Sequence, residues 1–151
     1  MKQAIENIVA ICTGEADVIA NMATISCELF YGDARFDWVG FYRNIGGEVL
    51  KVGPYQGGHG CLTIPFSRGV CGAAARLGEA QIVDDVDCFD GHIACASSTR
   101  SEIVLPVLDE NGALLGVLDI DSNQPAAFSR SDADVLATML YKVFATGQKS
   151  A

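Results

Sequence analysis

The stretch that decides the fold is Ser101-Glu-Ile-Val-Leu-Pro-Val-Leu108, then Asp109-Glu-Asn-Gly112, then Ala113-Leu-Leu-Gly-Val-Leu-Asp-Ile-Asp121. Two apolar runs of strand length flank a short turn that contains Asn-Gly, a strong local signal for a β-hairpin. The sequence therefore predicts an antiparallel hairpin built from strands 101–108 and 113–121.

Shorter strand signals precede this hairpin. The strand-length runs are 36–42, 49–52, 61–66 and 81–83. Gly46-Gly47 joins the first two as a turn, and the glycine-rich segment 53–60 is expected to be a loop. Residues 73–77 are expected to begin a short helix. The sequence thus indicates about six strands joined mostly by hairpins.

Both ends of the chain carry helical patterns. Residues 4–30 place apolar side chains at helical spacing, and Thr13-Gly14 is expected to divide them into two helices. Near the C-terminus, Ser129 followed by Asp132 is a typical N-cap for a last helix with one apolar stripe. These helices can bury their apolar faces against a sheet.

The elements together predict an α+β domain over residues 1–151. Its N- and C-terminal helices pack on one face of an antiparallel sheet of about six strands. The long stretch 53–98 is poor in regular structure but has apolar anchors and turn glycines. Long loops in compact domains usually serve function, so we expect this one to form a folded pocket wall.

Composition excludes several classes of partner. The 151 residues include 10 Lys plus Arg and 19 Asp plus Glu, a formal charge of −9. Nucleic acids and anionic membranes favour basic proteins, so neither is expected as a partner. The chain begins with no secretory signal pattern and has no apolar run of membrane length. We therefore expect a cytoplasmic location.

Six cysteines are unusual for such a chain; they are Cys12, Cys27, Cys61, Cys71, Cys88 and Cys95. Structural disulfides are rare in the cytoplasm, so burial or redox chemistry is the expected use. Cys12 and Cys27 lie on helical segments and are expected in the core. Cys61, Cys71 and Cys95 lie in or beside loops, as reactive thiols do. Cys71 opens the predicted short helix, whose dipole would favour its thiolate.

Zinc is not predicted. His59-Gly60-Cys61 and Cys88-x3-His92-x2-Cys95 contain suitable donor types. Their spacing matches no strong zinc template, and the chain has no CxxC pair. His92 is interpreted as a loop histidine that is hydrogen-bonded to backbone. The sequence also indicates no cofactor.

Three acids are expected to converge. Asp119 and Asp121 are two apart on a strand and face the same side. Pairing across the 109–112 turn brings Glu102 to the same end of the hairpin. Such crowding raises the pKa of at least one acid unless a cation lies between them, and an ammonium group is the natural partner. Trp38 and Tyr42 share one strand face and form either core or the apolar wall of a pocket.

Five motifs resemble one family over nearly the whole chain, the GAF-domain free methionine-(R)-sulfoxide reductases. They are Trp-Val-Gly-Phe-Tyr (38–42), Ile-Pro-Phe-Ser-Arg-Gly-Val-Cys-Gly (64–72), Phe-Asp-Gly-His-Ile-Ala-Cys (89–95), Arg-Ser-Glu-Ile-Val-Leu-Pro (100–106) and Leu-Gly-Val-Leu-Asp-Ile-Asp-Ser (115–122). The cysteine-bearing motifs are the specific ones, because GAF sensor domains usually lack them. The resemblance implies the GAF fold.

The resemblance also implies a reaction. A thiolate attacks the sulfoxide sulfur, methionine leaves, and the resulting sulfenic acid condenses with a second cysteine to a disulfide that thioredoxin reduces. By motif position, Cys95 matches the nucleophile, Cys61 the main resolving cysteine and Cys71 an auxiliary recycling cysteine. The substrate-binding positions matched by motif are Glu102, Asp119, Asp121 and Trp38.

Some alternatives stay open at this stage. Cys88 lies outside the family's motif cysteines and is a second candidate to trap the Cys95 sulfenate in place of Cys61. A GAF module that binds a small molecule without turnover, and a thiol redox sensor, are the competing functions. The resemblance suggests a homodimer, and no sequence feature decides it.

Overall fold

The computed structural model describes residues 1–93 and 95–146 and contains a six-stranded antiparallel sheet in the order β3-β2-β1-β6-β5-β4. The strands are β1 (Trp38–Asn44), β2 (Val49–Gln56), β3 (Thr63–Pro65), β4 (Gln81–Val83), β5 (Ser101–Leu108) and β6 (Leu114–Ser122). The α-helices are α1 (Lys2–Cys12), α2 (Val18–Gly32), α3 (Gly69–Leu77) and α4 (Arg130–Leu140); η1 (Val86–Cys88) is a short 3-10 helix, and η2 (Tyr141–Ala145) is a π-helix that follows α4. Within these described residues, none of the helices has the length and apolar character needed to cross a bilayer.

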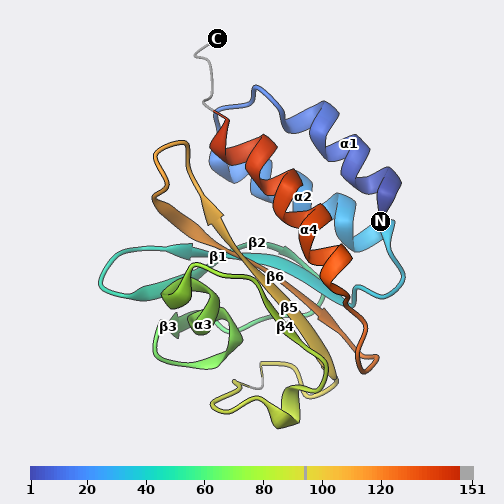
Figure 1. Cartoon of the computed structure of the whole chain (residues 1–151), viewed down its shortest axis with the longest axis vertical. Coiled ribbons are helices and arrows are strands. Elements are labelled where there is room, and N and C mark those ends of the chain that lie inside the picture. Colours follow the sequence, from blue (N-terminus) through green and yellow to red (C-terminus); the bar gives the residue numbers. More distant parts are fainter. Residues whose placement is uncertain (94, 147–151) are drawn as a thin grey trace.

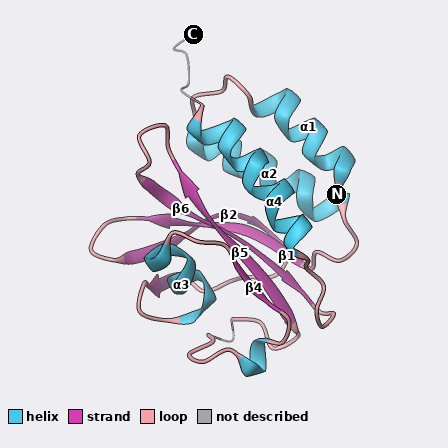
Figure 2. Cartoon of the chain, viewed as in Figure 1, coloured by secondary structure: helices cyan, strands magenta, loops and turns pink. Residues whose placement is uncertain are grey.

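The sheet separates two layers. Helices α1, α2 and α4 cover one face, while α3 and the segment that follows β4 lie on the other (Figures 1 and 2). Successive side chains of β5 point to opposite faces of the sheet. Ile103 and Leu105 point into the core under the three helices, and Val104 points into the core beside α3. The α+β prediction, with terminal helices on one face of six antiparallel strands, is confirmed.

Several local predictions were wrong in their bounds; for example, the strands predicted at 36–42 and 61–66 run over Trp38–Asn44 and Thr63–Pro65. Residues 53–56, expected in a loop, continue β2, because Tyr55 and Gln56 pair with Gly40 and Val39 of β1. Helix α3 begins at Gly69, four residues before the predicted start. Gly69 adopts φ +69°, a left-handed value that favours glycine. The strand-length hairpin 101–121 and the Ser129 capping box lie where the sequence placed them.

The two helical cysteines have different fates. Cys12 is buried among the side chains of α1 and the sheet, as predicted. Cys27 is exposed, so its assignment to the core was wrong. The buried face of α2 carries Met22, Ile25 and Leu29, and Cys27 lies outside this stripe. Helical periodicity across 4–30 therefore located the helix but not the orientation of every small apolar residue.

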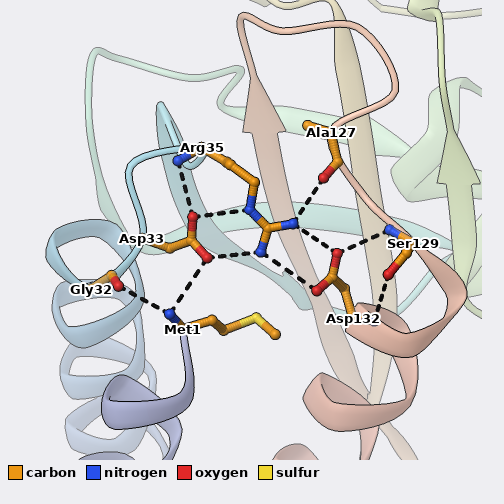
Figure 3. Close-up of polar contacts among 7 residues, drawn as sticks. All are labelled: Met1, Gly32, Asp33, Arg35, Ala127, Ser129 and Asp132. Atoms are coloured by element: carbon orange, nitrogen blue, oxygen red, sulfur yellow. Dashed lines mark hydrogen bonds and ion pairs between the residues drawn. The ribbon is translucent and has the colours of Figure 1, made fainter.

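One ion-pair cluster joins the ends of three helices (Figure 3). The Arg35 guanidinium donates to Asp33 at 2.7 Å and to Asp132 at 2.8 Å. The N-terminal ammonium of Met1 lies 3.5 Å from Asp33. Arg35 also donates to the carbonyl of Ala127, just before α4. We call Arg35, Asp33, Asp132 and the Met1 ammonium the Arg35 cluster; it connects α1, the end of α2 and the start of α4.

Candidate active site

Strand register brings the predicted acids together. Glu102 on β5 pairs with Asp121 on β6, and Asp121 pairs with Trp38 on β1. The next row on the same face places Asp119 opposite Gly40. Glu102, Asp119 and Asp121 therefore lie on adjacent strands at one end of the sheet, on the face away from the three large helices. We call these three residues the pocket acids.

The pocket acids are largely buried, and the imidazole of His92 lies beside one of them, Glu102. Glu102 is 6% exposed and Asp119 is 5% exposed. Among the described residues, Oδ1 of Asp119 and Oδ1 of Asp121 have no hydrogen-bond partner. Burial raises the pKa of both aspartates, and repulsion from neighbouring acids raises it further. The arrangement can hold a proton near neutral pH and offers oxygens to a positively charged ligand.

Aromatic rings form the adjoining wall. The Trp38 ring stacks on Tyr42 at 5.8 Å between centroids and on Tyr55 at 5.3 Å. Its indole Nε1 donates to the carbonyl of Gly58 at 2.7 Å, which fixes the ring. A side chain at Gly40 would clash with the Trp38 ring. Trp38 and Tyr42 thus belong both to the core and to a pocket wall, the two alternatives that the sequence left open. Each is buried in the core beside α3, and each lines the cavity.

A disulfide lies beside the cavity, since one of its two cysteines, Cys95, lines that cavity. Cys61, after β2, is bonded to Cys95, and their Cα atoms are 5.4 Å apart. Both residues are partly buried. The segment carrying Cys95 is anchored at both ends, because the Val86 amide donates to Arg100 and the Arg100 amide donates to Ser122. The middle stretch is therefore a folded pocket wall, as the sequence indicated.

One cavity collects most of the predicted residues. Its lining includes the predicted pocket residues Glu102, Asp119, Asp121, Trp38 and Tyr42, together with Cys71 and Cys95. Its free volume in this disulfide form is about 30 Å³. A water molecule needs about 10–15 Å³, so the space holds about two or three waters and is too small for an amino acid. In the disulfide form, the cavity therefore has no room for a free amino acid.

Cys71 differs from its prediction. It lies within α3 and is 4% exposed. Burial raises the pKa of its thiol well above the usual range, and Asp119 and Glu102 raise it further. The expected thiolate at a helix N-terminus is therefore wrong for this state, because desolvation and nearby acids outweigh the helix dipole.

Cys88 lies apart from the cavity. It is exposed, and its Sγ lies 3.6 Å from Oδ2 of Asp85. The Asp85 carboxylate raises the pKa of this thiol. A thiol kept protonated at the surface is a poor nucleophile. Of the two candidate partners for Cys95, the structure pairs Cys61.

His92 has a role that the sequence did not indicate. Its backbone amide donates to Phe89, but its side chain reaches into the cavity. Nε2 lies 3.6 Å from Oε2 of Glu102, and this carboxylate raises the pKa of the imidazole. The interpretation of His92 as a backbone-bonded loop residue was therefore incomplete. Thr99 also lines the cavity, and no motif or spacing had singled it out.

Comparisons with known proteins show the family to which the chain belongs. The model of the GAF domain family matches residues 12–143. The free methionine-R-sulfoxide reductase of Escherichia coli (strain K12) is 41% identical over 140 residues, covering 91% of this chain and 84% of that protein. The enzyme of the same name from Saccharomyces cerevisiae is 38% identical over 129 residues, 82% of this chain and 72% of that protein.

A solved structure gives the same picture. The free methionine-R-sulfoxide reductase from Neisseria meningitidis, in complex with its substrate, superposes with a TM-score of 0.87 at 38% identity. The match covers 94% of this chain and 84% of that one. The similarity therefore extends across the sheet, the helices and the pocket wall.

Proposed function

This chain belongs to the GAF-domain family of free methionine-(R)-sulfoxide reductases, and we propose on this premise how its residues perform the reaction. The protein reduces free methionine-(R)-sulfoxide to methionine with electrons from its own thiols. The observation that carries this conclusion is the Cys61–Cys95 disulfide beside a cavity that Cys95 and the pocket acids line.

Cys95 is the nucleophile. Its thiolate attacks the sulfoxide sulfur, the sulfur–oxygen bond breaks, and the oxygen ends on Cys95 as a sulfenic acid while methionine leaves. The Cys61 thiol then displaces that oxygen as water and forms the Cys61–Cys95 disulfide. The two cysteines supply two electrons in total. The disulfide in the structure corresponds to the product of this second step.

The pocket acids bind the substrate and supply its proton. A carboxyl whose pKa is raised by burial is protonated near neutral pH and can donate to the departing oxygen. The remaining carboxylate oxygens accept hydrogen bonds from the substrate α-ammonium, which supports Asp119, Asp121 and Glu102 as its ligands. A peptide-bound residue lacks this ammonium. Trp38 and Tyr42 border the apolar part of the substrate.

The oxidised protein needs an external dithiol. Thioredoxin is the reductant in our proposal, and the partial exposure of Cys61 and Cys95 supports access by such a partner. Cys71 assists recycling, and reduction must first open the pocket that buries it. Family resemblance supports a homodimer, and the four free cysteines are consistent with the cytoplasm.

An epimer-resolved assay tests this function. Purified protein is mixed with thioredoxin, its reductase and NADPH, and methionine release is measured for each epimer of the free sulfoxide. We expect turnover of the R epimer, little of the S epimer, and a loss of about 1,000-fold or more in Cys95→Ser. Cys27→Ser is the matched control, because Cys27 is exposed outside the cavity. Saturable binding without methionine release would instead identify a non-catalytic module.

A further inference from the structure

Three donor atoms of different chemistry meet in the cavity. The Sγ of Cys71 and one carboxylate oxygen each from Glu102 and Asp119 lie within 4.8 Å of one another. All three residues are buried. They come from α3, β5 and β6, which are elements of regular structure packed in one core. We call them the thiol–carboxylate triad.

The triad includes a buried carboxylate oxygen that has no hydrogen-bond partner among the described residues. Oδ1 of Asp119 is buried and has no hydrogen-bond partner within residues 1–93 and 95–146. Asp121, two residues along β6, presents a second such oxygen. The cationic side chain next to this group is His92, which lies against Glu102. Buried oxygens without partners are costly, so the triad favours a cation that binds oxygen directly.

The donor types select the cation. Mg²⁺ and Ca²⁺ prefer oxygen-only sites, whereas a thiolate with carboxylates suits Zn²⁺. Around one zinc ion, with bonds of about 2.0–2.3 Å, ligand atoms lie about 3.5 Å apart, so small side-chain rotations complete the set. The remaining free volume of about 30 Å³ fits an ion with one water.

We propose that Cys71, Glu102 and Asp119 bind a single thiophilic divalent cation, with Zn²⁺ as the best fit, in both the disulfide form and the reduced form of the protein. The Cys71 thiol releases its proton to solvent and the sulfur bonds to the ion, with no change of oxidation state. A divalent ion neutralises more of the acidic pocket than a single ammonium does. The ion therefore occupies the place of the substrate ammonium and inhibits reduction; this last clause alone rests on the proposed function.

Sequence spacing gives no sign of this site. The ligands lie 31 and 17 positions apart along the chain, from Cys71 to Glu102 and from Glu102 to Asp119. The histidine–cysteine pairs that were considered for zinc use other residues, and two of those cysteines form the disulfide. Only the fold brings the triad together.

Cobalt titration tests the site without any activity. The starting protein carries the Cys61–Cys95 disulfide together with Cys27→Ser and Cys88→Ser, which remove the exposed thiols. We expect one Co²⁺ per chain, a thiolate-to-cobalt charge-transfer band, and loss of that band when Zn²⁺ is added. Adding Cys71→Ser abolishes the band, and Glu102→Gln weakens binding about tenfold or more while Cys71 remains.

The opposite results overturn the proposal. A band that survives Cys71→Ser, an affinity unchanged by Glu102→Gln, or saturation only at millimolar metal would indicate an adventitious ion only. Circular dichroism and the melting temperature identify variants that fail to fold, and Glu102→Gln then decides the assignment.

A second readout tests inhibition. Single-turnover methionine release by the reduced protein is measured at increasing Zn²⁺, with each variant normalised to its own zinc-free rate. We expect the half-inhibiting zinc concentration to rise about tenfold or more in Cys71→Ser, and an unchanged value contradicts inhibition through this site. If no methionine appears even without zinc, the proposed function fails, while the cobalt titration still decides the metal site.

Discussion

Two carboxylate clusters on opposite sides of the sheet show opposite electrostatics. In the Arg35 cluster, hydrogen bonds from the guanidinium lower the pKa of Asp33, and the same guanidinium holds the pKa of Asp132 low against its burial (Figure 3). In the cavity, burial and mutual repulsion raise the pKa of Asp119 and Asp121. Both clusters contain aspartates. They differ because the chain places a full positive charge, the Arg35 guanidinium, beside Asp33 and Asp132 but not beside Asp119 and Asp121.

Because of this difference, we expect the Arg35 cluster to contribute to stability and the pocket acids to contribute to function. The Arg35 cluster is electrically complete within the chain and joins three helices. In our proposals, a substrate ammonium or a metal ion from outside the chain neutralises the pocket acids. Buried charges without partners destabilise a fold, and such local conflicts are typical of functional sites. Mutations in the two clusters should therefore have opposite effects.

The largest expected effect is the loss of activity in Asp119→Asn. The amide keeps the shape but cannot bind an ammonium or a proton as a carboxylate does, so kcat/KM should fall about 100-fold or more. The measurement is steady-state methionine formation from the R epimer. Asp132→Asn is the matched control in the Arg35 cluster, and its kcat/KM should stay near the wild-type value. Equal losses in both variants would remove the distinction between the clusters.

The next effect is the loss of stability in Arg35→Met. The Arg35 side chain is 31% exposed, between a surface ion pair and a buried one. Removing it takes the guanidinium from both Asp33 and Asp132, which should cost about 2 kcal/mol in the free energy of unfolding. Urea denaturation measures this loss, and Arg35→Lys should recover part of it. The kcat/KM of the folded variant should not change, and a large fall would contradict a purely structural role.

The pH dependence of stability should have opposite signs in the two clusters. Asp33 and Asp132 have lowered pKa values when folded, so their contribution is full above about pH 4, the ordinary unfolded value, and disappears as pH falls further. Asp119 has a raised pKa, so ionising it costs stability as pH rises above about 4.

Denaturation at several pH values checks this contrast. The stability gained by Asp119→Asn relative to wild type should be small near pH 4 and grow toward pH 8. The stability lost by Arg35→Met should stay constant over that range and shrink only below pH 4. Parallel curves for the two variants would contradict the assigned pKa shifts.

The smallest effect is expected at Cys88, beside a carboxylate that water already solvates. Because Cys88 is exposed and outside the cavity, Cys88→Ser should leave turnover within about twofold of wild type. Mass spectrometry of the oxidised variant should still find the Cys61–Cys95 bond. Accumulation of Cys95 sulfenic acid in Cys88→Ser would instead make Cys88 the resolving residue.

Local patterns predicted most of the fold and part of the site. The hairpin 101–121 was located from its turn and apolar runs, and its register then placed Glu102 beside Asp121. Helix caps and strand alternation depend on residues that are close together in the chain, so a single sequence is enough to predict them. The pairing of Cys61 with Cys95 came from family resemblance, because a disulfide partner 34 residues away has no local signal.

Long-range packing explains what the sequence did not reveal. The exposure of Cys27, the burial of Cys71 in α3 and the contact of His92 with Glu102 all depend on which elements meet in space. The strand residues 53–56 were hidden by glycine and proline, whose ordinary signal is a loop. Their pairing with β1 outweighs that local preference.

Substrate discrimination tests the central claim most directly, namely that the pocket acids are completed by the substrate ammonium. The measurement is kcat/KM for free methionine-(R)-sulfoxide and for its analogue with a hydroxyl in place of the ammonium, in wild type and in Asp119→Asn. We predict that wild type prefers the ammonium substrate by about 100-fold and that Asp119→Asn reduces this preference at least about tenfold. The same preference in both proteins would contradict the account.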